Sequence, residues 1–442
     1  MQRLRRTLAA FLAACLLLAG IGLGASAAGT GFTVKNPYAG VDWGTDKPWR
    51  GNLHTHTTLS DGNNSLADMV ERHYELGYDF LAITDHGTVD RSWTELNNAK
   101  LIQTVLNLTK DGDRAAAPLT QARWQAISAG AGRDGRGMLR VPFGNEQNPT
   151  SLNNAHVNSW FADWGHGFLG GTSDYETPVR EVDKRGGLCV LNHVGRYTAQ
   201  DEKSTADAYE GLMGKYYVTK IQRLLEKYPA LLGIDVNSKS DGETRNDRKL
   251  WDKLLTNLAP SGRSVYGLAT SDTHGLGGID TGFIWALMPA NTVENLKASL
   301  KTGAFFAASH DIKNPGELAQ WAEETGLTLG SEWKADREAD EPMVTKITVE
   351  AGKITLETDN ALAVHWVSDG KVVAKGPSIE LSACEGLGAY VRAELFGNGG
   401  VLYTQPFLLE YDGMPAGSAV PWYFFDFGGL LAVFRRVALW FM

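Results

Sequence analysis

The sequence contains little cysteine and no repeated unit. Three cysteines occur in 442 residues, and Cys15 lies in an N-terminal segment that we expect to be removed. Cys189 and Cys384 fall in different predicted domains, and the apolar run around Cys189 favours a buried free thiol. These features exclude a disulfide-stabilised scaffold. The sequence also lacks internal repeats and low-complexity tracts, and its composition does not indicate broad disorder.

Positive charge is also scarce. Lysine and arginine total 42 against 51 aspartates and glutamates, which gives a formal net charge of -9. This balance argues against a surface that coats nucleic acid, because phosphate contacts require clustered lysine and arginine. A nucleotide as a small substrate remains compatible with it. The length and the 43% hydrophobic content predict a large catalytic domain plus one smaller domain.

The N-terminal segment has the pattern of a secretory signal peptide. Basic residues Arg3, Arg5 and Arg6 precede an apolar run over residues 8–23, and small residues follow at 25–27. A buried N-terminal helix is the alternative interpretation. We expect a signal peptide over residues 1–27 and export to an extracellular, periplasmic or cell-surface location.

Short apolar runs alternate with helical patterns, which predicts an α/β fold with a parallel sheet. Several runs end in a polar residue and read as buried strands: residues 80–84, 138–143, 188–191, 232–235 and 265–270. Ser65 fits the cap of a helix that ends at Gly77, and residues 216–228 form another helical pattern. Polar residues at the carboxyl ends of strands are typical of a barrel active site.

The pattern of the sequence predicts several parts. A barrel-like catalytic domain covers residues 43–312, and a charged linker covers residues 331–341. The period then becomes two over residues 343–411, which predicts a small antiparallel β-domain of the sandwich kind.

An apolar, aromatic tail occupies residues 413–442, and its densest part begins at Trp422. Asp426, Arg435 and Arg436 interrupt this part. It therefore fits an interfacial or docked helix as well as a membrane span, so membrane contact through the tail is one expectation.

Nine histidine and acidic side chains form the strongest signal in the chain. Imidazole and carboxylate bind Zn, Mn and Fe at neutral pH, and nine such groups exceed the four that one structural zinc needs. Two or three divalent ions fit better, and sites of this kind usually carry out hydrolysis. His54 and His56 point to the same side of an extended segment, so they can grip one ion together. The predicted ligands are His54, His56, Asp61, His86, Glu146, His156, His193, Asp272 and His274.

These motifs resemble the PHP family, named for polymerase and histidinol-phosphatase domains. The shared order is His-x-His-x4-Asp-Gly, Thr-Asp-His, Gly-x-Glu, His ten residues later, Asn-His and Ser-Asp-x-His, over residues 51–310. The resemblance implies a distorted (β/α)7-like barrel, a trinuclear site held by the nine ligands, and hydrolysis of phosphate mono- or diesters. It also implies that Glu146 or Asp61 bridges two ions.

The sequence departs from that pattern in two places. Val194 stands where many relatives have proline, and the interval from Asp85 to Glu146 is long. We expect residues 115–137 of this interval to cover the pocket. Residues 292–303 and 305–309, together with the export signal and the β-domain, look most like the secreted CehA/McbA branch related to carbaryl hydrolases. Some members of that branch cleave carbamate or amide bonds.

Two further residues are candidates for catalysis. Asp85 adjoins His86 and could orient an imidazole, although a helix cap at a strand end fits equally. Arg196 could clamp a phosphate oxygen through its planar guanidinium, or it could be a solvated surface residue. The remaining histidines read as structural: His73, His166, His310 and His365.

The leading hypothesis is an exported phosphoesterase that uses a metal-bound hydroxide in a di- or trinuclear site. A hydrolase of carbamate, amide or carboxylic ester bonds with the same site is the alternative. A non-catalytic binding module is the third interpretation, and the complete ligand set argues against it.

Overall fold

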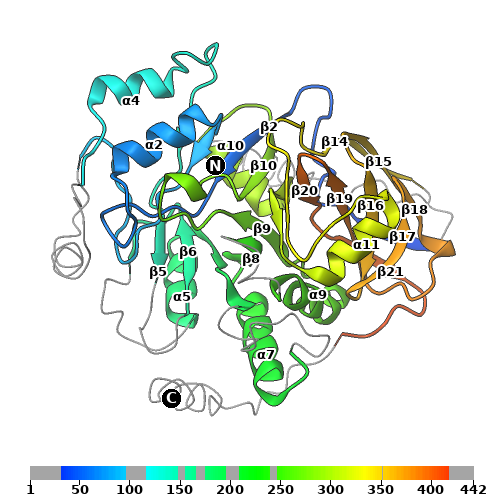
Figure 1. Ribbon diagram of the computed structural model, residues 1–442. Coiled ribbons are helices and arrows are strands. Elements are labelled where there is room, and N and C mark those ends of the chain that lie inside the picture. Colours follow the sequence, from blue (N-terminus) through cyan, green and yellow to red (C-terminus); the bar gives the residue numbers. More distant parts are fainter. Residues whose placement is uncertain are drawn as a thin grey trace, which may run out of the picture.

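The computed structural model describes residues 31–95, 116–147, 155–165, 175–195, 209–238, 246–350 and 352–417 (Figure 1). Within these residues the chain has a mixed α/β fold with an additional antiparallel β region. The predicted signal peptide, Arg196, His166 and most of the apolar tail lie outside the described residues. Among the described residues, no helix is both long and apolar enough to cross a bilayer.

Two groups of parallel strands carry most of the predicted ligands at their carboxyl ends. β2 (Lys47–Asn52), β3 (Phe80–Leu81) and β4 (Leu139–Arg140) form the first group. β7 (Leu188–Leu191), β8 (Leu231–Ser238) and β9 (Tyr266–Thr270) form the second. Each of the five apolar runs therefore contains a strand. β3 and β4 cover only two residues of their runs.

Two strands of the second sheet depart from the parallel arrangement. β5 (Asn145–Gln147) and β6 (Val157–Trp160) pair antiparallel with each other, and β6 pairs antiparallel with β7. The connection between β5 and β6 is shorter than the dozen or more residues that a parallel crossover needs. The chain therefore turns back on itself at this point, which the apolar pattern did not reveal.

The two sheets meet at two isolated parallel bridges. One bridge joins Thr55, which follows β2, to Thr273, which follows β9. The other joins His86 to Glu146. Both bridges lie among the predicted ligands, so backbone pairing joins the two sheets at the place where those side chains meet.

Helices with one buried face pack against these sheets. Ser65 caps α2 (Leu66–Glu75), as predicted, and Ser65 and Asp68 form a capping box that satisfies two backbone donors. Its buried face carries Met69, Val70 and His73. α7 (Leu212–Lys227) confirms the second predicted helix. The other helices are α4 (Gln121–Ser128), α5 (Glu176–Lys184), α9 (Asp247–Leu258), α10 (Val293–Thr302) and α11 (Pro315–Thr325), with 3-10 turns η1 (Ala259–Ser261), η2 (Leu276–Gly278) and η3 (Leu381–Ala383).

The C-terminal part of the chain is antiparallel, as its period of two predicts. A three-stranded sheet contains β14 (Met343–Glu350), β15 (Lys353–Asp359) and β18 (Ser378–Glu380). It shares one hydrophobic core with strands of the larger sheet, including β16 (Ala363–Ser368) and β19 (Tyr390–Gly397), as expected for two packed sheets. β17 (Lys371–Lys375), β20 (Gly400–Tyr403), β21 (Phe407–Tyr411) and the N-terminal β1 (Phe32–Lys35) complete this region, seen at the right of Figure 1.

One continuous sheet crosses the predicted boundary between the two domains. β20 pairs with β11 (Phe305–Ser309), which pairs with β10 (Gly282–Met288), and β10 pairs with β2. The predicted linker also makes contacts: β13 (Trp333–Lys334) pairs with β12 (Asp311–Ile312). The limits 43–312 and 343–411 stay predictions, and the sheet ties the two parts together.

Candidate metal centre

The nine predicted ligands converge at the carboxyl ends of the parallel strands. His54 and His56 follow β2, Glu146 lies on β5, and Asp272 follows β9. Three groups of these side chains bring their ligand atoms within 4.8 Å of one another. The groups are His56, Asp61, His86 and His274; His54, Glu146, His193 and Asp272; and His86, Glu146 and His156. Each of the nine residues belongs to at least one group.

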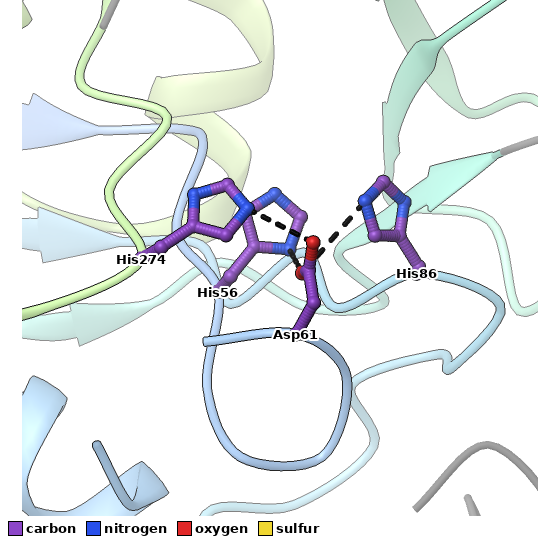
Figure 2. Close-up of side chains that lie close together, drawn as sticks. All are labelled: His56, Asp61, His86 and His274. Atoms are coloured by element: carbon purple, nitrogen blue, oxygen red, sulfur yellow. Dashed lines mark hydrogen bonds and ion pairs between the residues drawn. The ribbon is translucent and has the colours of Figure 1, made fainter. Parts of the chain in front are cut away.

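The first group surrounds the carboxylate of Asp61 (Figure 2). Asp61 Oδ2 lies 3.2 Å from His274 Nε2, and Asp61 Oδ1 lies 3.5 Å from His56 Nδ1 and 3.8 Å from His86 Nε2. Figure 2 shows the three imidazoles turned toward this carboxylate from different segments of the chain. Asp61 is the most exposed of the nine, which places this group nearest to solvent.

The carboxylate of Glu146 belongs to both other groups. Its Oε2 atom lies 3.2 Å from His54 Nε2, 3.1 Å from His56 Nε2 and 3.3 Å from His86 Nδ1. Its Oε1 atom lies 2.8 Å from His156 Nδ1 and 3.3 Å from His193 Nε2. The two oxygens thus face different sets of nitrogens, as a carboxylate between two cations would require.

The donor atoms around Asp272, which come from the first and second groups, fit a cation better than they fit one another. His54 Nε2 and His56 Nε2 lie 3.1 Å apart, and each lies 3.2 Å from Asp272 Oδ1. Both imidazoles are fully buried. Two ring nitrogens and the oxygens of two carboxylates point at one small volume, and neutral imidazole plus carboxylate is the donor set of a transition-metal site.

Electrostatics favour neutral rings at His86 and His193 and ionised carboxylates at Glu146 and Asp272. Burial lowers the pKa of His86 and of His193 to about 4, so both rings can offer a lone pair at neutral pH. Burial alone would raise the pKa of Glu146 and of Asp272, but the neighbouring histidines, His54 foremost, hold both well below their usual values. Against the effect of burial, the carboxylates of Asp272 and Glu146 raise the pKa of His56 well above its usual value, so a cation that binds there would have to displace a proton from this ring.

Two of the ligands adopt a backbone conformation that is uncommon for residues other than glycine. The φ angle is 30° at His193 and 44° at Asp272. Such conformations cost energy and persist where the surrounding structure holds them, often at functional sites. At these two positions the strand ends and the backbone turns, which directs each side chain into the cluster.

Asp85 acts on a ligand through an intermediate hydroxyl. Its carboxylate accepts hydrogen bonds from the Thr57 amide at 2.8 Å, the Thr57 hydroxyl at 2.7 Å and the Ser60 hydroxyl at 2.6 Å. Ser60 Oγ in turn lies 3.3 Å from His56 Nδ1. Asp85 therefore holds the loop that contains Ser60 and supports the His56 imidazole, which agrees with an orienting role rather than a helix cap.

Sequence reasoning missed the contributions of Ser60 and of the Asn192 side chain. Asn192 Nδ2 donates to Glu146 Oε1 at 2.9 Å and so fixes one oxygen of the shared carboxylate. Asn192 stands directly before His193 at a strand end, and this position could have predicted that its side chain lies in the site. Ser60 gave no such signal, because its partners His56 and Asp85 come from separate segments.

The remaining described histidines take part in other networks. His73 is buried in α2, and His310 lies 2.9 Å from Glu341 through Nε2. His365 stacks on Trp321 with ring centroids 3.8 Å apart. These placements agree with the interpretation that none of the three histidines is a metal ligand.

Residues 116–137 contact α2 and the turn that follows it. Arg133 donates to the carbonyls of Tyr78 and Gly77, and the hydroxyl of Tyr74 donates to Ala131 O. Figure 1 shows α4 beside α2. Trp124 also packs on Trp93, which follows His86, so these residues contact segments on both sides of β3. The expectation that residues 115–137 cover the pocket stays a prediction.

Comparison with known proteins supports a PHP domain. The PHP domain family model matches residues 52–122, a segment that contains His54, His56, Asp61 and His86. The match covers less than half of the chain, so these residues are similar to the PHP domain. No curated protein sequence matches the chain.

Several solved structures are similar in part. One is a two-domain protein from Bacteroides vulgatus that contains a predicted PHP-like metal-dependent phosphoesterase, with 13% identity, a TM-score of 0.41, and 89% of this chain and 97% of that chain covered. PsfC from Pseudomonas syringae has 17% identity, a TM-score of 0.33, and 56% and 85% covered. The lesion-specific endonuclease EndoQ from Pyrococcus furiosus has 11% identity, a TM-score of 0.33, and 58% and 56% covered.

Proposed function

We propose that this protein is a metal-dependent phosphoesterase with a di- or trinuclear site. The observation that carries the proposal is the position of Glu146, whose two carboxylate oxygens face separate sets of histidines. The PHP domain match over the first ligand segments supports the same reaction class. Together they favour a hydrolase of phosphoric esters over a structural metal site, which needs four ligands and one ion.

The fold contributes the frame for this site. The bridges between Thr55 and Thr273 and between His86 and Glu146 join the two strand groups on both sides of the cluster. We infer from these bridges a distorted (β/α)7-like barrel in which ligands from distant parts of the sequence meet at one end. That arrangement is the usual place of an active site in barrels.

The ligands divide among two or three divalent ions of Zn, Mn or Fe. When bound, such ions supply a Lewis acid for the ester and an activated water as the nucleophile. The residues of the chain hold and orient them: Asp85 fixes His56 through Ser60, and Asn192 fixes Glu146. The three carboxylates of the cluster balance the positive charge of the ions.

Substrate preference distinguishes the proposed phosphoesterase from the alternative, a hydrolase of carbamate, amide or carboxylic ester bonds. Arg196 would clamp a phosphate oxygen, which favours phosphate esters. The resemblance of residues 292–303 and 305–309, which form α10 and β11, to the CehA/McbA branch favours carbamate, amide or carboxylic ester bonds instead. A non-catalytic binding module is the weakest reading, because all nine ligands are present and converge.

We further propose that the protein is exported and acts on a small ester. The pattern of residues 1–27 supports export, and the net charge of -9 supports a small substrate rather than a nucleic-acid polymer. Membrane contact through residues 413–442 belongs to the same proposal.

The experiment that tests the function is turnover of a matched substrate panel by the protein without residues 1–27. The panel contains an aryl phosphomonoester, an aryl phosphodiester and an aryl carbamate, each with chelator and with Mn or Zn added back. We expect metal-restored turnover of a phosphate ester and a much larger loss for phosphate than for carbamate in Arg196→Ala. Turnover of the carbamate alone would replace the phosphoesterase proposal by its alternative. If the metal-bound protein turned over none of the three substrates, the result would favour a non-catalytic binding module.

A further inference from the structure

Asn52 lies at the carboxyl end of β2, two residues before His54, and none of its surface is exposed. The side-chain amide of this residue contacts both of the segments that carry the ligand pairs His54/His56 and Asp272/His274. We propose that Asn52 is a positioning residue of the metal centre, which clamps these two segments together, and that His73 fixes the orientation of its amide. This inference rests on the proposed metal-dependent function.

On the β2 side, Asn52 holds the segment that contains His54. Its Oδ1 atom accepts a hydrogen bond from the His54 backbone amide at 3.2 Å. Its Nδ2 atom, whose two protons point to Ser271 and His73, also lies 3.0 Å from Thr55 Oγ1. Thr55 is the residue between the two histidines, and its backbone forms the bridge to Thr273. These contacts limit rotation of the ligand-bearing backbone.

On the β9 side, Asn52 holds Ser271, the residue before Asp272. Asn52 Nδ2 donates to Ser271 Oγ at 2.6 Å, and Asn52 Oδ1 accepts from the Ser271 amide at 3.3 Å. Ser271 Oγ then donates to the His54 carbonyl at 3.3 Å, which closes a ring of hydrogen bonds. One side chain thus fixes two segments that are 219 residues apart in the sequence.

His73 determines which way the Asn52 amide points. His73 Nδ1 lies 2.7 Å from the Met69 carbonyl, which can only accept, so Nδ1 carries the proton. Nε2 of the neutral ring is then an acceptor, and it lies 3.0 Å from Asn52 Nδ2. Burial lowers the pKa of His73 to about 4, so the ring stays neutral at neutral pH. A flipped amide would bring two acceptors together.

The clamp predicts a selective effect on metal binding. The group of His54, Glu146, His193 and Asp272 takes ligands from both clamped segments, and so does the group around Asp61. The group of His86, Glu146 and His156 takes none from either. Loss of the clamp should therefore weaken the ions held by the first two groups and spare an ion held by the third, whereas general destabilisation would affect all of them.

The test is competitive metal titration of Asn52→Leu, which has a similar shape and lacks all of these hydrogen bonds. We expect at least one ion to bind about 10- to 100-fold more weakly while another keeps its wild-type affinity. Asn314→Ala serves as the matched control, because Asn314 is a buried asparagine that caps α11 away from the cluster. It should lower thermal stability without changing any metal affinity. Unchanged binding in Asn52→Leu, or equal weakening of all ions, would overturn the proposal.

The variants His73→Gln and His73→Leu keep the inference testable if Asn52→Leu does not fold. Gln retains an oxygen that can accept from Asn52, so it should bind metal like the wild type, whereas Leu should weaken the same ions as Asn52→Leu. Equal behaviour of the two His73 variants would contradict the role of His73. Failure of the proposed function itself would look different, because the wild-type protein would then bind no metal or bind it without turnover of any ester.

Discussion

The ligand cluster and the ion-pair network around Arg392 are both buried, but they balance charge in different ways. Arg392 forms two hydrogen bonds with Asp252, at 2.9 and 2.8 Å, and a third with Glu394. The hydroxyl of Tyr390 adds another hydrogen bond to Asp252 at 2.8 Å. In this network each charged group has an opposite charge beside it. The ligand cluster contains three carboxylates and six imidazoles, with no lysine or arginine among them.

This difference separates a structural network from a binding site. A buried ion pair with complete hydrogen bonding is satisfied by the protein itself, and it ties α9 to β19. A cluster of carboxylates and imidazoles presents the oxygen and nitrogen lone pairs that divalent cations accept. The second arrangement is stable when cations bind it. Four experiments test whether the two regions differ in this way.

The largest effect is expected from Arg392→Ala. Removing the guanidinium leaves Asp252 and Glu394 buried without their partner, which should lower the free energy of unfolding by about 3–5 kcal/mol. Chemical denaturation measures this change. Metal content and turnover of the folded fraction should stay at wild-type values. Arg185→Ala is the control, because its pair with Glu181 is largely exposed and should contribute less than about 1 kcal/mol. Equal effects of the two variants would contradict a structural role for Arg392.

The next effect is that of His193→Ala on the ligand cluster. His193 Nε2 lies 3.3 Å from Glu146 Oε1, and its loss should remove about one bound ion and lower activity roughly 10²-fold or more. Elemental analysis and steady-state kinetics measure the two quantities. Stability of the metal-free protein should change much less than in Arg392→Ala. Unchanged metal content and rate would rule out His193 as a ligand.

Chelation should affect the ligand cluster alone. A metal at a free concentration about 100 times its Kd stabilises the folded state by about 2.7 kcal/mol, so its removal should lower Tm measurably. The apo protein should remain folded, because separate hydrophobic cores and the Arg392 network do not depend on the ions. Thermal scans with and without chelator check this, and circular dichroism reports the fold. A metal-free chain that unfolds completely would make the ions structural.

The smallest effect is expected from Ser60→Ala and Asp85→Asn. Both remove support from the His56 imidazole, so each should lower activity about 10-fold through weaker metal binding. Because the two residues act along one path, the double variant should lose little more than either single variant. Kinetics at several metal concentrations measure this. Fully additive losses would show that Ser60 and Asp85 act independently.

Local patterns of the sequence revealed the parts of the site. His54, His86, His193 and Asp272 each follow a strand or an apolar run, and residue type alone marks them as ligands. Ser65 and the apolar spacing after it predicted α2 with its correct start. These features depend on neighbours within a few residues, so hydrophobic period and side-chain chemistry suffice.

Contacts between segments that are distant in the sequence could not be predicted from these local patterns. Three features depend on which elements pack together. They are the antiparallel pairing of β5 with β6, the continuous sheet from β2 through β11 to β20, and the position of residues 116–137. Ser60 carries no chemical signal of its own, and its role follows from two partners brought to it by the fold.

Residue types and their spacing were enough to predict a set of imidazole and carboxylate ligands on an α/β framework, because ligand chemistry and strand periodicity are local properties. The tertiary structure alone decided how those ligands divide into three groups, that Glu146 belongs to two of them, and that Asn52 joins segments 219 residues apart. Those facts depend on distances between atoms that only packing of the whole chain sets.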